Sequence, residues 1–131
     1  MDRRLCTCAL GVGLLFPVLS EPARAQTGGA PAASRWESFA SCAAAYRANW
    51  QNRLTDPNRT PSMAAMIQEE YEQYREAAIG LYERERKASK EEAGRIVDAH
   101  MQAGADAFIA MDKTGKLEAY IDQCPQVEDA N

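Results

Sequence analysis

Residues 34–54 read SRWESFASCAAAYRANWQNRL, and this stretch sets the fold class. Its large apolar side chains recur at steps of three or four residues, which places them on one stripe of an α-helix. The stripe consists of Trp36, Phe39, Ala43, Tyr46, Trp50 and Leu54. Ser34 and Glu37 have the spacing of a capping box, in which each residue satisfies a free backbone N–H of the other. The pattern predicts an amphipathic helix after Ser34, with Cys42 at the border of its apolar stripe.

A second helix is predicted over residues 62–86, after two helix-breaking segments that contain Pro57 and Pro61. Charged residues occupy its other faces, as in a helix with one solvated side. Its apolar stripe consists of Ile67, Tyr71, Tyr74, Ala78 and Leu81, extended at the start by Met63 and Met66.

A third helix is predicted to begin at Lys90, because Ser89 and Glu92 repeat the capping-box spacing. The alternative is one long kinked helix that continues through Ala88. Gly104 lies on the predicted apolar face and would permit close approach of a neighbouring backbone. That face consists of Ala93, Ile96, Val97, His100, Gly104, Ala107, Phe108 and Met111.

A short last helix completes the helical domain, which spans residues 34–124. Its apolar side consists of Leu117, Tyr120, Ile121 and Cys124, and Pro125 ends it. Residues 125–131, PQVEDAN, read as a frayed tail. Short connections between consecutive helices favour antiparallel neighbours. The sequence therefore predicts an all-α fold, a small antiparallel bundle of three long helices plus a short C-terminal helix.

The first 25 residues have the three parts of a secretory signal peptide. Arg3 and Arg4 precede an uncharged, mostly apolar run over residues 5–19, and small residues lead to a cleavage site after Ala25. The run is shorter than the ~20 residues that span a membrane, although an uncleaved N-terminal anchor is the alternative. Residues 26–33 read as a flexible leader. We therefore expect a periplasmic or secreted protein.

Cleavage of the signal would leave two of the four cysteines, Cys42 and Cys124. Both lie on apolar stripes, and an oxidising compartment favours their pairing as a structural disulfide. The alternatives are a redox-active pair, which usually has C-x-x-C spacing, and two metal thiolates, which would need further ligands. The sequence predicts a Cys42–Cys124 disulfide.

Charge argues against a nucleic-acid partner. Loss of three arginines and two acidic residues with the signal changes the formal net charge from −4 to −5. Affinity for nucleic acid depends largely on neutralising phosphates, so a mildly acidic domain is a poor binder. The remaining chain has no second apolar run of membrane-spanning length, so no transmembrane anchor is expected after cleavage.

Motifs for catalysis and for cofactors are not found. The chain has one histidine, His100, and Asp98 two positions earlier lies on a different helix face. Copper is an alternative, because imidazole and thioether ligands suit it and Met63, Met66, Met101 and Met111 are available. Methionine more often fills gaps in a helical core. We therefore expect no cofactor and no metal, with His100 as the weak candidate.

The function expected from these features is that of a non-enzymatic binding or structural module of the cell envelope. Its partner would be an envelope protein or an apolar ligand, bound in a groove that Trp50 and Tyr82 line. An acid- or stress-responsive envelope chaperone is the first alternative, because acidification would neutralise many carboxylates. A metal-binding protein that uses His100 is the second.

Overall fold

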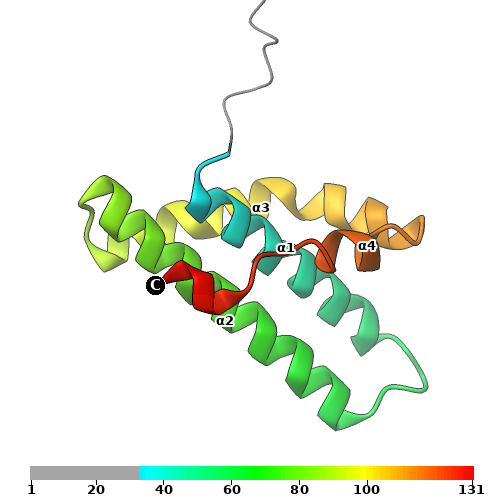
Figure 1. Cartoon of the computed structure of the whole chain (residues 1–131). Helices are drawn as coiled ribbons and strands as arrows, with labels where there is room; N and C mark the ends of the chain where they lie inside the picture. The colour runs from blue at the N-terminus through cyan, green and yellow to red at the C-terminus, as the bar shows by residue number, and fades with distance from the viewer. Residues whose placement is uncertain (1–32) are drawn as a thin grey trace, which may run out of the picture. The chain divides into compact units, whose positions relative to one another are not determined.

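A computed structural model describes residues 33–131. They form the helices α1 (Arg35–Leu54), α2 (Pro61–Arg86), α3 (Lys90–Lys113) and α4 (Leu117–Ile121), followed by a 3₁₀ helix over Val127–Ala130 (Figure 1). The predicted all-α architecture is confirmed. The predicted signal peptide and the leader up to residue 32 lie outside the described residues. No helix within residues 33–131 is both long and apolar enough to cross a membrane.

Helix α1 is the centre of the bundle, since α2, α3 and α4 all contact it. The Glu37 carboxylate accepts the backbone N–H of Ser34 at 2.9 Å, as the capping box predicts. The Ser34 hydroxyl itself has no partner within hydrogen-bonding distance, so its side of the capping box is not closed by a hydrogen bond. Small side chains on several faces let the other helices approach α1 closely. The buried alanines of α1 are Ala40, Ala43, Ala44, Ala45 and Ala48.

Helix α2 begins one residue before the predicted start. The Thr60 hydroxyl accepts the backbone N–H of Met63 at 3.3 Å, and Pro61 occupies the first turn, where its missing N–H costs nothing. The helix ends at Arg86 because Lys87 adopts a left-handed conformation with φ of 53°. The alternative of one long helix through Ala88 is therefore wrong.

Helix α3 begins at Lys90 as predicted, and the Ser89 hydroxyl accepts the backbone N–H of Glu92 at 3.2 Å. Its buried face differs from the predicted one. Met101 is 2 % exposed, whereas His100 is half-buried and Ala107 is exposed. Helix α3 is rotated so that its buried positions follow the series Ala93, Val97, Met101 and Phe108.

The sequence predicts that Gly104 lets a neighbouring backbone approach, and the structure shows no such approach. A Cβ at this position would meet only the Phe108 ring of the same helix, at 3.4 Å. The missing side chain therefore makes room for an aromatic ring one turn later.

The C-terminal residues are ordered on the bundle, so the prediction of a frayed tail is wrong. Ala130 is buried, and the Tyr74 hydroxyl donates to the Pro125 carbonyl at 2.8 Å. The side chains of Arg35 and Arg84 also donate to the carbonyls of Asp129 and Ala130. The Cys42–Cys124 pair lies at the start of this segment, beside α1. We call residues 122–131 the C-terminal strap, which runs across α1 and α2 in Figure 1.

Substitution of Tyr74 by phenylalanine tests the attachment of the C-terminal strap. The change removes the bond to the Pro125 carbonyl and keeps the ring, which stacks on Tyr46 at 5.2 Å between ring centroids. We expect a loss of about 1 kcal/mol of unfolding free energy at neutral pH. Urea unfolding measures it, and an unchanged midpoint would contradict the attachment.

The raised pKa of Tyr74 leads us to expect a loss of stability at alkaline pH. Burial, followed by the nearby Tyr46 and acidic groups, raises the pKa of Tyr74 to about 12. A raised pKa means that folding favours the protonated phenol. This stabilisation is complete below pH ~10, the value in the unfolded chain, and is lost as the pH rises towards 12. We expect stability to fall over that interval in the wild type, with a smaller fall in the Tyr74→Phe variant.

Candidate functional site

The structure brings Cys42 and Cys124 together. Their Sγ atoms lie 2.14 Å apart and their Cα atoms 5.9 Å apart, which is disulfide distance. Cys42 is buried in the middle of α1, whereas Cys124 follows α4 and is half-buried. The pair therefore joins the C-terminal segment to the central helix.

A groove of about 580 Å³ opens beside this cysteine pair, within the size range of ligand sites. One wall is the N-terminal half of α1, a second is His100 of α3, and the third is the segment after α4. Hydroxyl, imidazole and amide groups converge on it, while the sulfur atoms and Pro125 supply apolar surface. The polar side chains that line the groove are Glu37, Ser38, Ser41, His100, Tyr120 and Gln123.

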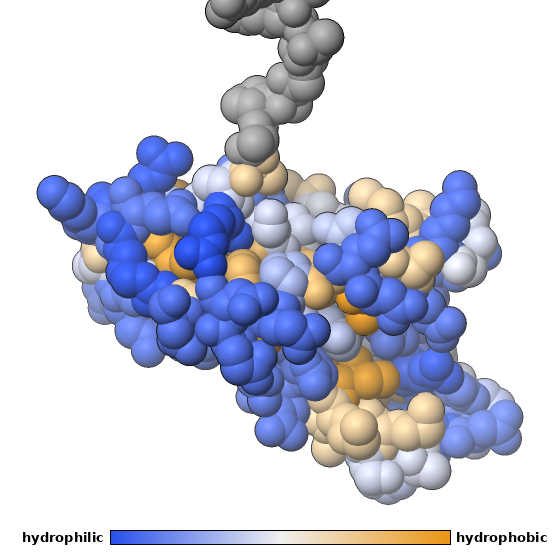
Figure 2. Space-filling view, in the orientation of Figure 1, coloured by the Kyte–Doolittle hydropathy of each residue, from blue (hydrophilic) through white to orange (hydrophobic). Residues whose placement is uncertain are grey.

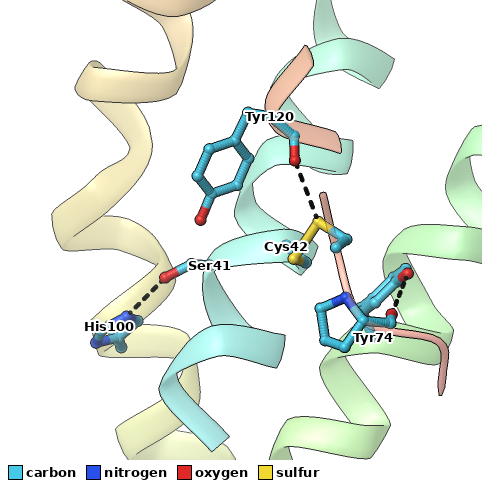
Figure 3. Close-up of a disulfide and its surroundings, with 7 residues drawn as sticks. Ser41, Cys42, Tyr74, His100 and Tyr120 are labelled. Atoms are coloured by element: carbon cyan, nitrogen blue, oxygen red, sulfur yellow. Dashed lines mark hydrogen bonds between the residues drawn. A yellow bond between two sulfur atoms is a disulfide. The ribbon is translucent and has the colours of Figure 1, made fainter. Parts of the chain in front are cut away.

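Ser41 and His100 form the polar centre of the groove. The Ser41 Oγ and His100 Nε2 atoms lie 3.1 Å apart, within hydrogen-bonding distance. Figure 3 shows the Tyr120 hydroxyl turned towards the same side of α1 as Ser41. The His100 ring also packs against the edge of Trp36, with ring centroids 5.3 Å apart. These contacts fix His100 at the groove wall, where its ring can bond a ligand.

The hydroxyl–imidazole pair lacks the third group of a hydrolytic triad. In such sites a carboxylate orients the histidine and backbone N–H groups bind the oxyanion. Among the described residues no carboxylate bonds His100, because Asp98 is paired with Arg75 instead. Ser41 lies inside α1, where the backbone N–H groups take part in the helix. The geometry suits the binding of a polar group better than its cleavage.

Charge is sparse in this groove. Glu37 is the one acidic side chain among the described lining residues, and no lysine or arginine is among them. Its carboxylate already accepts the Ser34 backbone N–H. The groove therefore fits an uncharged ligand.

The structure separates Trp50 from Tyr82, the two residues predicted to line a possible ligand or partner groove. The Tyr82 ring packs on Trp36, with centroids 5.0 Å apart. Trp50 lies fourteen positions after Trp36 on the same helix, which corresponds to a rise of about 21 Å. Tyr82 therefore lies beside the start of α1, whereas Trp50 lies near the end of α1, and both side chains are half-buried.

The candidate copper ligands are also apart. Met63 and Met66 lie at the start of α2, next to the end of α1. His100 instead contacts Ser41, which lies in the first half of α1. Met111 follows His100 by eleven positions, or about 16 Å along α3. Within residues 33–131 no group of three or more His, Cys, Asp or Glu side chains could hold a metal ion.

A second cavity, of about 690 Å³, lies between α2 and α3 and is strongly polar. At its wall Arg75 donates two hydrogen bonds to Asp98, at 2.7 and 2.8 Å, which ties α2 to α3. The hydrogen bond from Arg75, partly opposed by burial, lowers the pKa of the Asp98 carboxyl. Arg75, Glu76 and Asp98 of this cavity are paired within the bundle, whereas Arg47 and Glu72 form no ion pair among the described residues.

Sequence reasoning identified His100 and both cysteines but not Ser41, Tyr120 or the groove itself. Ser41 could have been noticed because it precedes Cys42 and lies one turn after Glu37. Its pairing with His100 depends on the rotation of α3, which no local pattern encodes.

No family model, curated protein or solved structure matches this chain.

Proposed function

We propose that this chain is an exported, non-enzymatic binding module, and that the groove beside Cys42 and Cys124 is its binding site. The observation that supports the proposal most is the convergence of uncharged polar side chains on a ligand-sized groove. Export accords with a cysteine pair at disulfide distance, because disulfides persist in oxidising compartments.

The partner proposed is a short uncharged segment of another envelope or secreted protein. Hydroxyl, imidazole and amide groups offer both donors and acceptors, as a peptide backbone requires. Pro125, Tyr120 and the sulfur atoms add apolar contacts for small side chains. The cysteine pair joins α1 to the segment after α4, and these two segments form two walls of the groove. The bundle would therefore hold the groove rigid for its partner.

An NMR titration tests this proposal. The ¹⁵N-labelled exported chain is titrated with blocked tetrapeptides of uncharged residues, at concentrations up to the millimolar range. We expect shifts in the amides of Ser38, Ser41 and Gln123, which line the groove. No shift at these positions with any peptide of the set would contradict the proposal.

Two variants supply the control. Ser38→Trp places a large ring in the groove and should remove the shifts. Gln102→Trp adds the same ring to α3 at an exposed residue of the other cavity and should leave them in place. Equal effects of the two variants would show that the shifts do not arise in the groove.

An acid-responsive envelope chaperone is the second candidate function. The observation that favours it is the Arg75–Asp98 pair, which fastens α2 to α3 through a carboxylate with a lowered pKa. A lowered pKa gives stability that is present above the unfolded value of ~3.9 and is lost as the pH falls through the folded value. Opening at low pH would therefore separate these two helices first.

Substitution of Asp98 by asparagine measures this contribution. Asp98 is 52 % exposed as a side chain, so solvent screening limits the pair to about 1 kcal/mol or less. We expect the variant to be slightly less stable than wild type at pH 7, and the difference to vanish as the pH falls through the lowered pKa of Asp98, by thermal unfolding. Binding of a hydrophobic dye from pH 7 to 2 then tests the chaperone, and a flat response would exclude it.

A further inference from the structure

Exposed apolar side chains gather at one end of the α1–α2 hairpin. Within residues 33–131, the large apolar side chains that are exposed are those of Leu54, Met63 and Ile109, each at 39 %, and Met66 at 68 %. The first two and Met66 lie where α1 ends and α2 begins, and the Arg59 side chain closes the connection by donating to the Leu54 carbonyl at 2.9 Å. We call Leu54, Met63 and Met66 the hairpin tip. Figure 2 shows orange and pale orange atoms at this end of the molecule.

The start of α2 lies beside the end of α1 and away from α3 (Figure 1). Its first buried residue is Tyr74, thirteen positions after the helix begins. Helix α3 covers the other end of α2 and diverges from it beyond the connection at residues 87–89 (Figure 1). The outer side of residues 61–68 is therefore uncovered, and it includes the most exposed methionine of the described residues.

Charge along α2 indicates which partner fits this side. Residues 61–68, PSMAAMIQ, carry no charged side chain, and the N-terminus of a helix bears a partial positive charge. The following residues carry Glu69, Glu70, Glu72 and Glu76. A second α2 in antiparallel orientation would set its uncharged start against these glutamates. A parallel one would set glutamates against glutamates.

We propose that two copies of this chain associate through the first halves of their α2 helices, antiparallel, about a two-fold axis near Met66. Such an interface is isologous, so Met66 of each copy packs against the same patch of the other. The small side chains Ser62 and Ala65 let the two helices approach. The hairpin tip has only three exposed apolar side chains, whereas a stable interface has about 20–30 residues a side, so the dimer is weak.

Sedimentation velocity of the exported chain, from 10 µM to 1 mM, tests the dimer. The average mass should rise from one towards two chains across this range. Met66→Glu should weaken the association at least tenfold, because it buries a charge near the two-fold axis, where the same introduced carboxylate of the second copy repels it. Ile109→Glu is the matched control on α3, an exposed apolar residue outside the hairpin tip, and should leave the association unchanged.

A charge variant tests the orientation of the helices. Glu70→Lys should weaken an antiparallel dimer, because the lysine would face the positive end of the partner helix. In a parallel dimer it would only replace facing glutamates by facing lysines and change little.

Two results would overturn the proposal. One is a single-chain mass up to 1 mM, and the other is an equal response to Met66→Glu and Ile109→Glu. If the chain stays monomeric while Met66→Glu stops it binding an unfolded protein such as reduced α-lactalbumin, the hairpin tip serves other chains. The proposal does not depend on the groove, and Ser38→Trp should leave self-association unchanged.

Discussion

Replacement of Cys42 and Cys124 by serine is expected to lower the free energy of unfolding by about 4.5 kcal/mol. The two residues are 82 positions apart, and the chain-entropy model gives roughly this value for a closed loop of that length. A domain of this size has a total stability of about 5–15 kcal/mol, so the variant should be partly unfolded at 37 °C. Urea unfolding followed by circular dichroism measures the loss.

The cysteine variant should lose its structure first in the C-terminal part of the chain. The short helix α4 has five residues and cannot persist by its own propensity. Hydrogen exchange should therefore show α4 and the C-terminal strap deprotected first, ahead of α1. Wild-type protein under reducing conditions is the control and should behave as the variant does. A loss below 1 kcal/mol would mean that hydrogen bonds and the buried Leu117 hold this segment without the cysteines.

Substitution of Phe39 by alanine is expected to cost about 3–5 kcal/mol, the second large effect. Phe39 is 2 % exposed, and its ring lies 5.9 Å from that of Tyr74 between centroids. Its removal leaves a cavity between α1 and α2, and the surrounding alanines of α1 are too small to fill it. Urea unfolding should show a lower midpoint with an unchanged m-value.

Ile109→Ala is the control for this cavity. It removes an apolar side chain that is 39 % exposed, so the expected loss is about 1 kcal/mol or less. Similar losses for the two variants would contradict the central position of Phe39 in the core.

The position of the groove was only partly predictable. The sequence identified both cysteines and predicted their pairing, because both border apolar stripes of helices expected in an oxidising compartment. It placed His100 in the core of α3, but the structure puts the ring at the groove wall beside Ser41. A helix rotation of less than one residue step changes which of His100 and Met101 is buried, and periodicity does not resolve such a step.

Local chemistry in the sequence by itself determined the helices. Ser34, Ser89 and the prolines define where helices begin, because capping bonds and missing N–H groups act within a few residues. Tertiary structure alone decided that α1 is buried on several sides, that Trp50 and Tyr82 face opposite ends, and that the C-terminal strap is ordered. Each of these depends on which helix covers which face. That choice is made by packing and by the cysteine pair between residues far apart in the chain, which no local spacing encodes.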